Sequence, residues 1–258
     1  LGRHFGACTD LLADIVLNPT FDPADLERER QVVLQEISMV EDTPDDIIHE
    51  MLSRMFWRDH PLGLSVLGSE ETVSGIDRDG ILRHMSRAYV PGTIIVTAAG
   101  NVDHRELVDR FAPLFGALDT REQLPPRRTP SSNGEISCHA KDLEQVHVCL
   151  GGCAPSQQDE KRFACSVFNT ILGGNMSSRL FQEVRENRGL AYSVFSFVSS
   201  YQDAGLIGVY AATEQGQVND LMATVRGEIR KLCDGQLTMP ELEAAKEYLI
   251  GSMYLSAE

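Results

Sequence analysis

Basic residues are scarce in this sequence: its 258 residues include 23 Lys and Arg against 38 Asp and Glu, a formal net charge of −15. A protein that binds nucleic acid carries a basic patch, so this balance argues against a nucleic-acid partner. It leaves room for a basic or unfolded polypeptide partner, although an excess of acidic residues more often serves only solubility.

No cysteine pattern indicates a disulfide framework, since the six cysteines form no CxxC pair. The segment "CLGGC" at 149–153 lies in an apolar, Gly-containing run that predicts a strand and its exit, so we expect buried thiols rather than a metal knuckle. A reducing compartment such as the cytoplasm fits this pattern. The sequence also has no signal peptide and no apolar run long enough to span a membrane, so we expect no membrane partner.

Neither end of the chain has the pattern of a natural terminus. The first residue is Leu1 rather than Met, and the segment that follows it already has a helical pattern. The last residues, "ELEAAKEYLIGSMYLSAE", continue a helical pattern to the end without a cap. We therefore expect the chain to be the middle of a longer protein, with further motifs outside it.

Helix-start signals recur in the first half. Asp22 and Thr43 each stand before a proline at the first helical position, and Asp103 begins a capping box. The run "TIIVTAAG" at 93–100 is apolar and β-branched and ends at a Gly-Asn pair, so it predicts a buried strand followed by a turn. The predicted helices cover residues 3–16, 23–40, 44–57, 77–88 and 103–115.

A segment rich in Pro, Ser and charge, "LDTREQLPPRRTPSSNGE" at 118–135, has no apolar period and predicts a domain linker. It divides the chain into a first domain at 1–120, a linker at 121–134 and a second domain at 135–258. The elements predicted in the second half are strands in "EISCHA" (135–140) and "QVHVCLGGCAP" (145–155), a helix at 159–172, a Gly-rich turn and helix over 173–187, an antiparallel strand pair at 191–201 and 204–213, and helices at 215–233 and 239–257.

One pattern occurs late in both halves. "TIIVTAAGNVDHRELVDRFAPLF" at 93–115 and "GLIGVYAATEQGQVNDLMATVRGEI" at 205–229 each combine an apolar strand, a short polar turn and an amphipathic helix. The likeness is one of pattern rather than of identity. It indicates two related α+β domains, as in a duplicated fold.

Two glutamates on the helix at 23–40 lie in an unexpected place. At 100° per residue, with Leu26 at zero, Glu29 and Glu36 fall near −60° and −80°, inside an apolar arc that extends to Val32 near −120°. We therefore expect both carboxylates to point toward other protein. A buried carboxylate must become neutral, pair with a cation or bind a metal, so a structural ion pair or a polar domain interface remains open. Seven residues rise about 10 Å, which allows one glutamate to ligate an ion while the other orients its surroundings.

The second half offers a second candidate pair. Arg185 and Tyr192 are seven residues apart, across a helix end and into a strand, and both side chains can donate to a developing oxyanion. The ordinary alternative is a surface arginine and a tyrosine ring in the core. Other signals are weaker: the sequence has no HExxH, no GxSxG and no phosphate-loop ending after "ILGGNM", and His49 is predicted on a helix surface.

Several of these segments together resemble the pitrilysin (insulinase) family of zinc peptidases, the inverted zincins, and most of all its short bacterial, processing-peptidase-like members. The resemblance covers essentially the whole chain in the family's order. "GGNMSSRLFQEVRENRGLAYSV" is a specific match. The segments that carry the resemblance are "LERERQVVLQEI" (26–37), "HPLGLSVLGSEETV" (60–73), "YVPGTIIVTAAGNVD" (89–103) and "ILGGNMSSRLFQEVRENRGLAYSV" (171–194).

The resemblance implies residue roles. The family's HxxEH helix supplies two zinc ligands and a glutamate base, and a third ligand follows roughly 75 residues later. Glu36 matches that third ligand and Glu29 its supporting residue, which puts HxxEH roughly 40 residues before the chain begins. Arg185 and Tyr192 match a pair that reaches the scissile carbonyl. The remaining match is the glycine-containing segment for substrate handling, Gly173 and Gly174.

The resemblance also implies a fold and an activity. We expect two homologous α+β domains, each a mixed, largely antiparallel sheet with helices on one face. The expected function is zinc-dependent hydrolysis of peptides in a closed chamber, formed by a homodimer or by a heterodimer with a homologous subunit. The chain alone, without HxxEH, is predicted neither to bind Zn²⁺ at this site nor to cleave peptides.

Two other interpretations remain open. A catalytically silent homologue, such as a partner or assembly subunit, keeps the fold without the activity. Two buried carboxylates favour the enzyme over the silent homologue, whereas the Arg185–Tyr192 pair does not discriminate between them. A generic two-domain binding protein would instead use Glu–Arg pairs for structure, with Arg30 or Arg54 as the cation.

Overall fold

The computed structural model describes residues 4–118 and 128–256. The described chain forms two compact units: the first is drawn from residues 1–38 and 67–127, and the second from residues 39–66 and 128–258. The boundary falls inside one long helix, α2 (Pro23–Asp42). Among the described residues, no helix combines the length and apolar character that crossing a membrane requires.

The first unit is helical. Helix α1 (Phe5–Leu17) packs against α6 (His104–Phe115). The side chains of Asp77 and Asp103 cap the starts of α5 (Arg78–Ala88) and α6. Arg30 on α2 donates to the carbonyl oxygens of Ser74 and Ile76 at 3.1 and 2.7 Å, which satisfies the end of α4. The helices of this unit besides α2 are α1 (Phe5–Leu17), α4 (Glu70–Gly75), α5 (Arg78–Ala88) and α6 (His104–Phe115).

Two predicted strands do not form. The segments at 93–100 and 135–140 have no strand pairing, and Ile95 and Ile136 are 86% and 91% exposed. A strand needs a hydrogen-bonding neighbour, and the described part of the first unit offers none to the run at 93–100. The segment at 135–140 belongs to the second unit but does not join the sheet there. The described chain therefore has an α+β fold with one three-stranded sheet, and a sheet in each of two domains is not observed.

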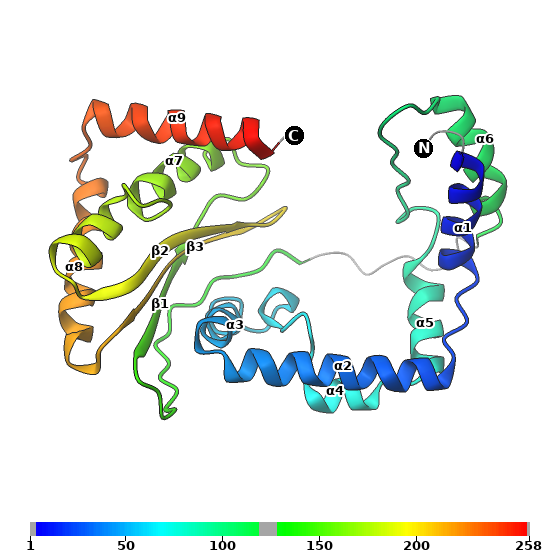
Figure 1. Cartoon of the computed structure of the whole chain (residues 1–258), viewed down its shortest axis with the longest axis horizontal. Helices are drawn as coiled ribbons and strands as arrows, with labels where there is room; N and C mark the ends of the chain where they lie inside the picture. Colours follow the sequence, from blue (N-terminus) through cyan, green and yellow to red (C-terminus); the bar gives the residue numbers. More distant parts are fainter. Residues whose placement is uncertain (1–3, 119–127, 257–258) are drawn as a thin grey trace. The chain divides into compact units, whose positions relative to one another are not determined.

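The sheet lies in the second unit (Figure 1). Its strands are β1 (Val146–Cys153), β2 (Ala191–Ser200) and β3 (Gly205–Thr213), in the order β1-β3-β2, and both pairings are antiparallel. The predicted strand within 145–155 and the predicted antiparallel pair are confirmed. Apolar and β-branched residues dominate all three strands, as expected for a sheet that is covered on both faces.

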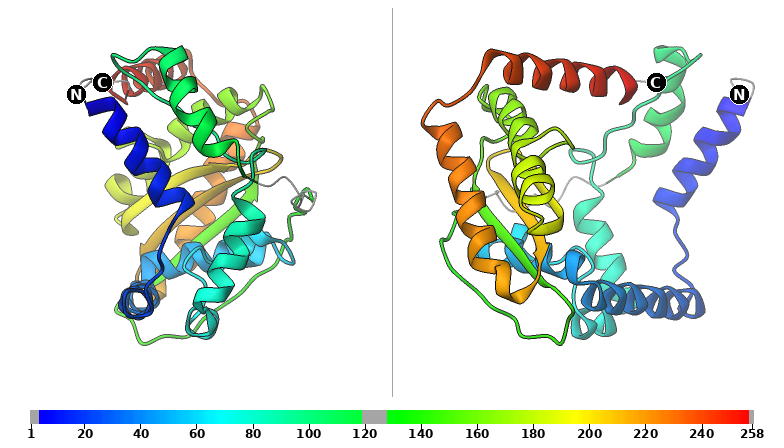
Figure 2. Two further views of the ribbon diagram at one scale, coloured as in Figure 1. Left: turned by 90° about the vertical axis from the view of Figure 1, so that its right-hand side faces the viewer. Right: turned by 60° about the vertical axis from the view of Figure 1, so that its left-hand side comes forward.

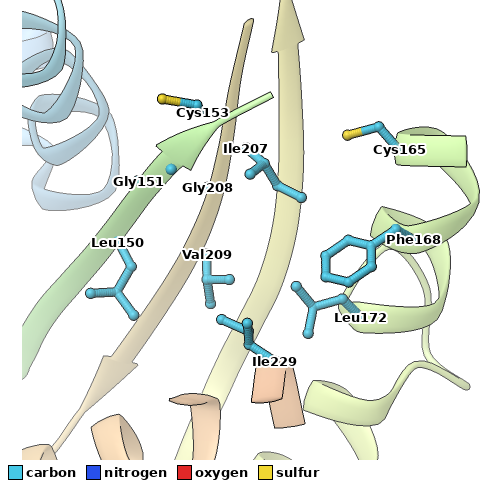
Figure 3. A pocket seen from close by; sticks show the side chains of 11 residues that line it. Leu150, Gly151, Cys153, Cys165, Phe168, Leu172, Ile207, Gly208, Val209 and Ile229 are labelled. Atoms are coloured by element: carbon cyan, nitrogen blue, oxygen red, sulfur yellow. The ribbon is translucent and has the colours of Figure 1, made fainter. Parts of the chain in front are cut away.

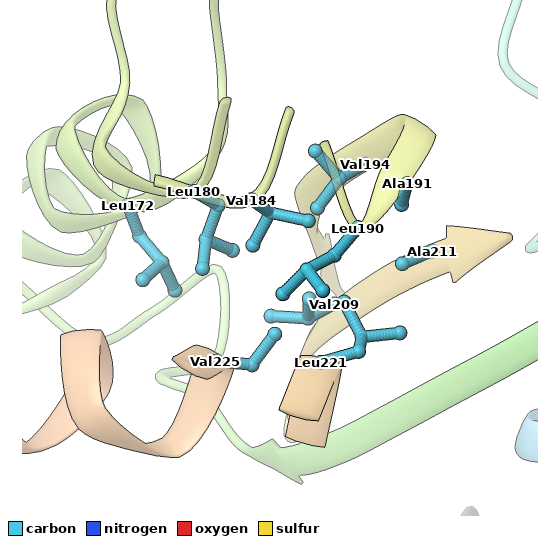
Figure 4. Close-up of a cluster of buried hydrophobic side chains, with 10 residues drawn as sticks. All are labelled: Leu172, Leu180, Val184, Leu190, Ala191, Val194, Val209, Ala211, Leu221 and Val225. Atoms are coloured by element: carbon cyan, nitrogen blue, oxygen red, sulfur yellow. The ribbon is translucent and has the colours of Figure 1, made fainter. Parts of the chain in front are cut away.

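One face of the sheet is covered by helices from the second half of the chain (Figures 1 and 2). They are α7 (Arg162–Leu172), the π-helix η3 (Phe181–Asn187) and α8 (Val218–Cys233), while α9 (Met239–Ser256) packs against α7. Leu180 and Val184 are fully buried there, and Figure 4 shows them among side chains from α7, α8 and β3.

The other face is covered by α3 (Pro44–Phe56), a helix from the first half of the chain. Its Leu52 and Phe56 pack with Leu206 of β3. A side chain at Gly151 would meet Leu52 Cδ1 at 2.9 Å, so the glycine of β1 permits this approach. The expectation of helices on one face only is thus wrong for this sheet, because both of its faces are apolar.

The predicted domain boundaries, 1–120 and 135–258, concern the fold of the whole protein and stay a prediction. Residues 121–127 of the predicted linker lie outside the described residues. Residues 128–134 have no regular secondary structure, and the Asn133 amide donates to the Phe56 carbonyl oxygen at 3.0 Å, which joins this segment to the end of α3.

Candidate functional site

Arg185 and Tyr192 lie together in the second unit. The guanidinium carbon of Arg185 lies over the Tyr192 ring, 4.2 Å from its centroid. Tyr192 is 77% exposed, so its ring is not in the core and the ordinary alternative is wrong on that point. A cation over an aromatic face at this distance contributes about 1 kcal/mol at an accessible site.

The local backbone explains how the two side chains meet. Arg185 is on the π-helix η3, which ends at Asn187. Just after this helix, the Leu190 amide donates to the Val184 carbonyl oxygen at 2.8 Å. Strand β2 begins one residue later at Ala191, so the chain reverses directly from the helix into the strand. Short π-helical segments are rare and are frequent at functional sites.

Within the part of the chain that the structure describes, the Arg185 side chain makes no hydrogen bond to a protein acceptor. Its side chain is 32% exposed, and its ion pair with Glu186 joins Nε and Oε1 at 3.6 Å, which is too long for a strong hydrogen bond. Arginine carries five N–H donors in a planar fork. The stacked guanidinium can therefore present N–H groups to a carbonyl, a carboxylate or an oxyanion.

Gly173 and Gly174 follow α7 directly, and a hydrogen bond joins Gly173 to β2, the strand that carries Tyr192. The Ser196 amide of β2 donates to the Gly173 carbonyl oxygen at 3.1 Å. A Cβ at Gly173 would lie 2.5 Å from the Ser196 nitrogen, and one at Gly174 would lie 2.9 Å from Thr170 Cα. Both positions therefore need glycine for close backbone approach, and their contact with substrate stays a prediction.

Arg179, in the same segment, ties the site to the last two helices. Its Nε and Nη2 donate to the two carboxylate oxygens of Glu241 at 2.8 and 3.0 Å, and its Nη1 lies 4.0 Å from Glu228. The Arg179 hydrogen bonds lower the pKa of Glu241 to about 2. No sequence pattern predicted this bidentate pair, which holds residues 173–187 against α8 and α9.

Glu29 and Glu36 are exposed on α2, so the prediction that both point toward other protein is wrong. The buried stripe of the helix is displaced to the other side: Leu34, about 80° from Leu26, belongs to it. Val32, which bounded the apolar arc, is 46% exposed. The buried and half-buried positions of α2 are Leu26, Arg30, Val33, Leu34, Ile37 and Val40.

A complete zinc site is not present among the described residues. No group of three or more His, Cys, Asp or Glu side chains within 4–118 and 128–256 is arranged to hold a metal ion. A zinc peptidase uses three protein ligands, so Glu36 can be at most one member of a set. Its exposed carboxylate has the right chemistry for that single role, and nothing in the described part of the chain completes it.

His49 was expected on the surface, yet it packs against the α3-facing side of the sheet. Its ring centroid lies 4.8 Å from that of Phe197 and 5.5 Å from that of Tyr210. Burial lowers the pKa of His49, while the carboxylates of Asp45 and Asp46 act in the opposite direction. His49 is thus a packed aromatic contact between α3 and the sheet.

A small apolar cavity of about 340 Å³ lies elsewhere in the second unit, between the sheet and α7 with α8. Figure 3 shows Phe168 and Leu172 of α7 facing Val209 of β3, with Cys153 and Cys165 at the rim. Its lining is apolar apart from the two thiols. It contains neither Arg185 nor Tyr192 and is separate from the candidate site.

Family models match the chain on both sides of residue 70. One described as "Insulinase (Peptidase family M16)" matches residues 2–70, and one described as "Peptidase M16 inactive domain" matches residues 75–249, more than half of the chain. The chain belongs to the M16 peptidase family. The resemblance inferred from the sequence motifs is confirmed, and M16 membership relates the chain to zinc peptidases.

Relatives of this M16 chain are named as zinc proteases. A Bacillus subtilis protein named an uncharacterized zinc protease is 38% identical over 258 residues, 100% of this chain and 63% of that protein. A Streptomyces coelicolor protein with the same description is 40% identical over 257 residues, 96% of this chain and 56% of that protein. The chain thus spans about three fifths of the length of these curated relatives.

Solved structures share the fold. The crystal structure of a peptidase M16 inactive domain from Pseudomonas fluorescens has a TM-score of 0.86 and 24% identity, covering 95% of this chain and 60% of that one. A Helicobacter pylori protease has a TM-score of 0.86 and 20% identity, with 98% and 62% covered. A chain of complex III2 from Candida albicans has a TM-score of 0.77 and 19% identity, with 98% and 61% covered. At these identities the likeness concerns the fold alone.

Proposed function

We propose that this M16 chain supplies part of the active site of a zinc-dependent endopeptidase that hydrolyses peptides or unfolded polypeptide segments. The observation that supports it most directly is the Arg185 guanidinium, stacked on the exposed Tyr192 ring with its N–H donors available. A peptide bond under hydrolysis develops negative charge on its carbonyl oxygen. An arginine fork and a phenol hydroxyl held beside each other are suited to that charge.

In this proposal the described residues have three tasks. Glu36 is one carboxylate ligand of the metal, and Glu29, two helical turns earlier, orients that ligand or its surroundings. Arg185 and Tyr192 receive the scissile carbonyl. Gly173 and Gly174 shape the backbone beside the substrate. A bound zinc ion would supply Lewis acidity and a water of lowered pKa, with its other ligands and the base provided by the whole protein.

The assembly belongs to the same proposal. We infer two homologous α+β domains in the whole protein and a closed chamber made by two halves, as a homodimer or with a homologous subunit. An acidic chamber would suit basic or unfolded peptides, consistent with the net charge of −15.

The test uses the whole protein that contains this chain. The Glu36→Gln variant keeps the shape of the side chain but removes its charge, and we expect zinc content by elemental analysis and cleavage of an unstructured peptide both to fall at least tenfold. Glu41→Gln, a matched change at another exposed position of α2, should retain both. Wild-type zinc content and activity in Glu36→Gln would refute the ligand role.

A catalytically silent subunit of the same fold is the second candidate, because a chain of a complex III structure shares this fold. The argument that two buried carboxylates favour the enzyme no longer holds, since Glu29 and Glu36 are exposed. Peptide cleavage by the purified whole protein separates the two candidates. If the purified whole protein cleaves no peptide and also contains no bound zinc, the result selects the silent subunit.

A further inference from the structure

Arg185 contacts two aromatic rings, not one. Its guanidinium carbon lies 4.2 Å from the centroid of Tyr192 and also 4.7 Å from the centroid of Phe181. The two rings come from different elements, because Phe181 begins η3 and Tyr192 is the second residue of β2. The planar cation is thus held from the helix and from the strand.

The two rings differ in how firmly the fold holds them. Tyr192 is 77% exposed, so it has little packing of its own beyond the guanidinium. Phe181 is half-buried and lies next to Leu180, which has no exposed surface. Phe181 is therefore the more buried of the two rings, and the Arg185 guanidinium lies over both of them.

Contact through the π faces leaves the edge of the guanidinium available. Aromatic rings attract the cation but accept no strong hydrogen bond from its N–H groups. The nearby Glu186 carboxylate lies 3.6 Å from Nε and does not occupy the rest of the fork. With a ring on each of two elements beside it and no hydrogen bond to a protein acceptor among the described residues, the planar fork can offer its donors to a ligand oxygen with a geometry that a lysine ammonium on a flexible stem lacks.

We infer that Phe181 is a positioning residue that holds the Arg185 guanidinium for the substrate carbonyl. This inference rests on the proposed peptidase function. Phe181 touches neither substrate nor metal in this account; it restricts the rotation of Arg185 so that the donors are directed before substrate arrives. Preorganised donors act on charge that develops during reaction, so their loss lowers kcat more than it raises KM.

The kinetic arm compares Phe181→Leu, Phe181→Tyr and Phe163→Leu in the whole protein, with an unstructured peptide as substrate. Phe181→Leu should lower kcat about tenfold and change KM less than twofold, whereas Phe181→Tyr, which retains a ring, should stay within twofold of wild type. Phe163→Leu is the matched control, because Arg162 lies over the Phe163 ring at 4.4 Å in another part of the second unit. Wild-type kcat for Phe181→Leu would overturn the inference, as would an equal loss for Phe163→Leu.

A second arm does not depend on activity. Phenylglyoxal labels accessible arginines, and peptide mass spectrometry gives the labelling rate of Arg185 relative to Arg188 in the same molecule. Removal of one stacked ring should raise that relative rate about threefold in Phe181→Leu and leave it unchanged in Phe163→Leu. If the wild type cleaves no peptide, the proposed function fails while this arm still decides: a raised rate supports the positioning role, and an unchanged rate overturns it.

Discussion

The guanidinium of Arg185 lies over the ring of Tyr192, 4.2 Å from its centroid, and the tyrosine is exposed rather than packed in the core. This stacking separates two contributions of one side chain. The ring supports the cation, and the hydroxyl is available to a substrate oxygen. A phenylalanine at this position removes the hydroxyl and keeps the ring.

Tyr192→Phe should keep the stack and lose the hydroxyl. If the hydroxyl donates to the developing oxyanion, kcat for peptide cleavage by the whole protein should fall about 100-fold with little change in KM. Tyr248→Phe, at an exposed tyrosine of α9, is the control and should be silent. A Tyr192→Phe enzyme with wild-type kcat would show that the hydroxyl has no part in the reaction.

Gly173→Ala and Gly227→Ala should have opposite effects on stability. At Gly173 the new Cβ would lie 2.5 Å from the Ser196 nitrogen, so backbone must move, and the free energy of unfolding should fall by about 1–3 kcal/mol. Gly227 is inside α8 and a Cβ there meets nothing within 4 Å, so alanine should add about 0.5–1 kcal/mol through helix propensity. Urea denaturation measures both; the same sign for the two variants would contradict the close approach at Gly173.

Arg179→Met should destabilise the second unit strongly. The change breaks the bidentate pair with Glu241 and removes the arginine that lies 4.0 Å from the buried Glu228, which keeps its ion pair with Lys231 at 2.6 Å. Losing charge-assisted hydrogen bonds of this kind costs about 1.5–3 kcal/mol. Arg226→Met, at an exposed position of α8, should change the free energy of unfolding by less than about 0.5 kcal/mol.

The same variant should flatten the acid side of the stability curve. The pKa of Glu241 is lowered from 4.5 to about 2 in the folded state, mainly by Arg179. The unfolded state therefore binds more protons between these values, so the contribution of Glu241 is complete above pH 4.5 and is lost as the pH falls toward 2. Arg179→Met should lose this component of the pH dependence, measured by denaturation between pH 6 and pH 3.

His49 should make stability depend on pH in a higher window. Burial lowers the pKa of His49 below its ordinary value of 6.5, so the unfolded state takes up a proton at a higher pH than the folded state. The contribution of His49 to the free energy of unfolding is therefore complete above pH 6.5 and declines as the pH falls below it. His49→Phe should remove this decline in urea titrations, whereas the same change at the exposed His139 should not. An equal decline in His49→Phe and wild type would mean that another group causes it.

Local signals predicted the helices well for a physical reason. The predicted caps Asp22 and Asp103 accept hydrogen bonds from amides of their own helices, so their effect does not depend on distant chain, whereas the predicted cap Thr43 makes no such bond. The β2–β3 pair was also predicted, because its strands are neighbours in sequence. The run at 93–100 has equally strong strand character but no pairing partner among the described residues, and it forms no strand.

The same contrast between local signals and tertiary contacts applies to the candidate site. The sequence by itself determined which residues are proposed for the chemistry, because Arg185, Tyr192, Glu29 and Glu36 stand in the segments that resemble the motifs of the family. Only the tertiary structure decided how they are presented. It exposes the two glutamates that a single-helix wheel placed inward, and it adds Phe181 to the arginine stack. Residue type is written locally, whereas burial and ring contacts depend on which surfaces the rest of the fold covers.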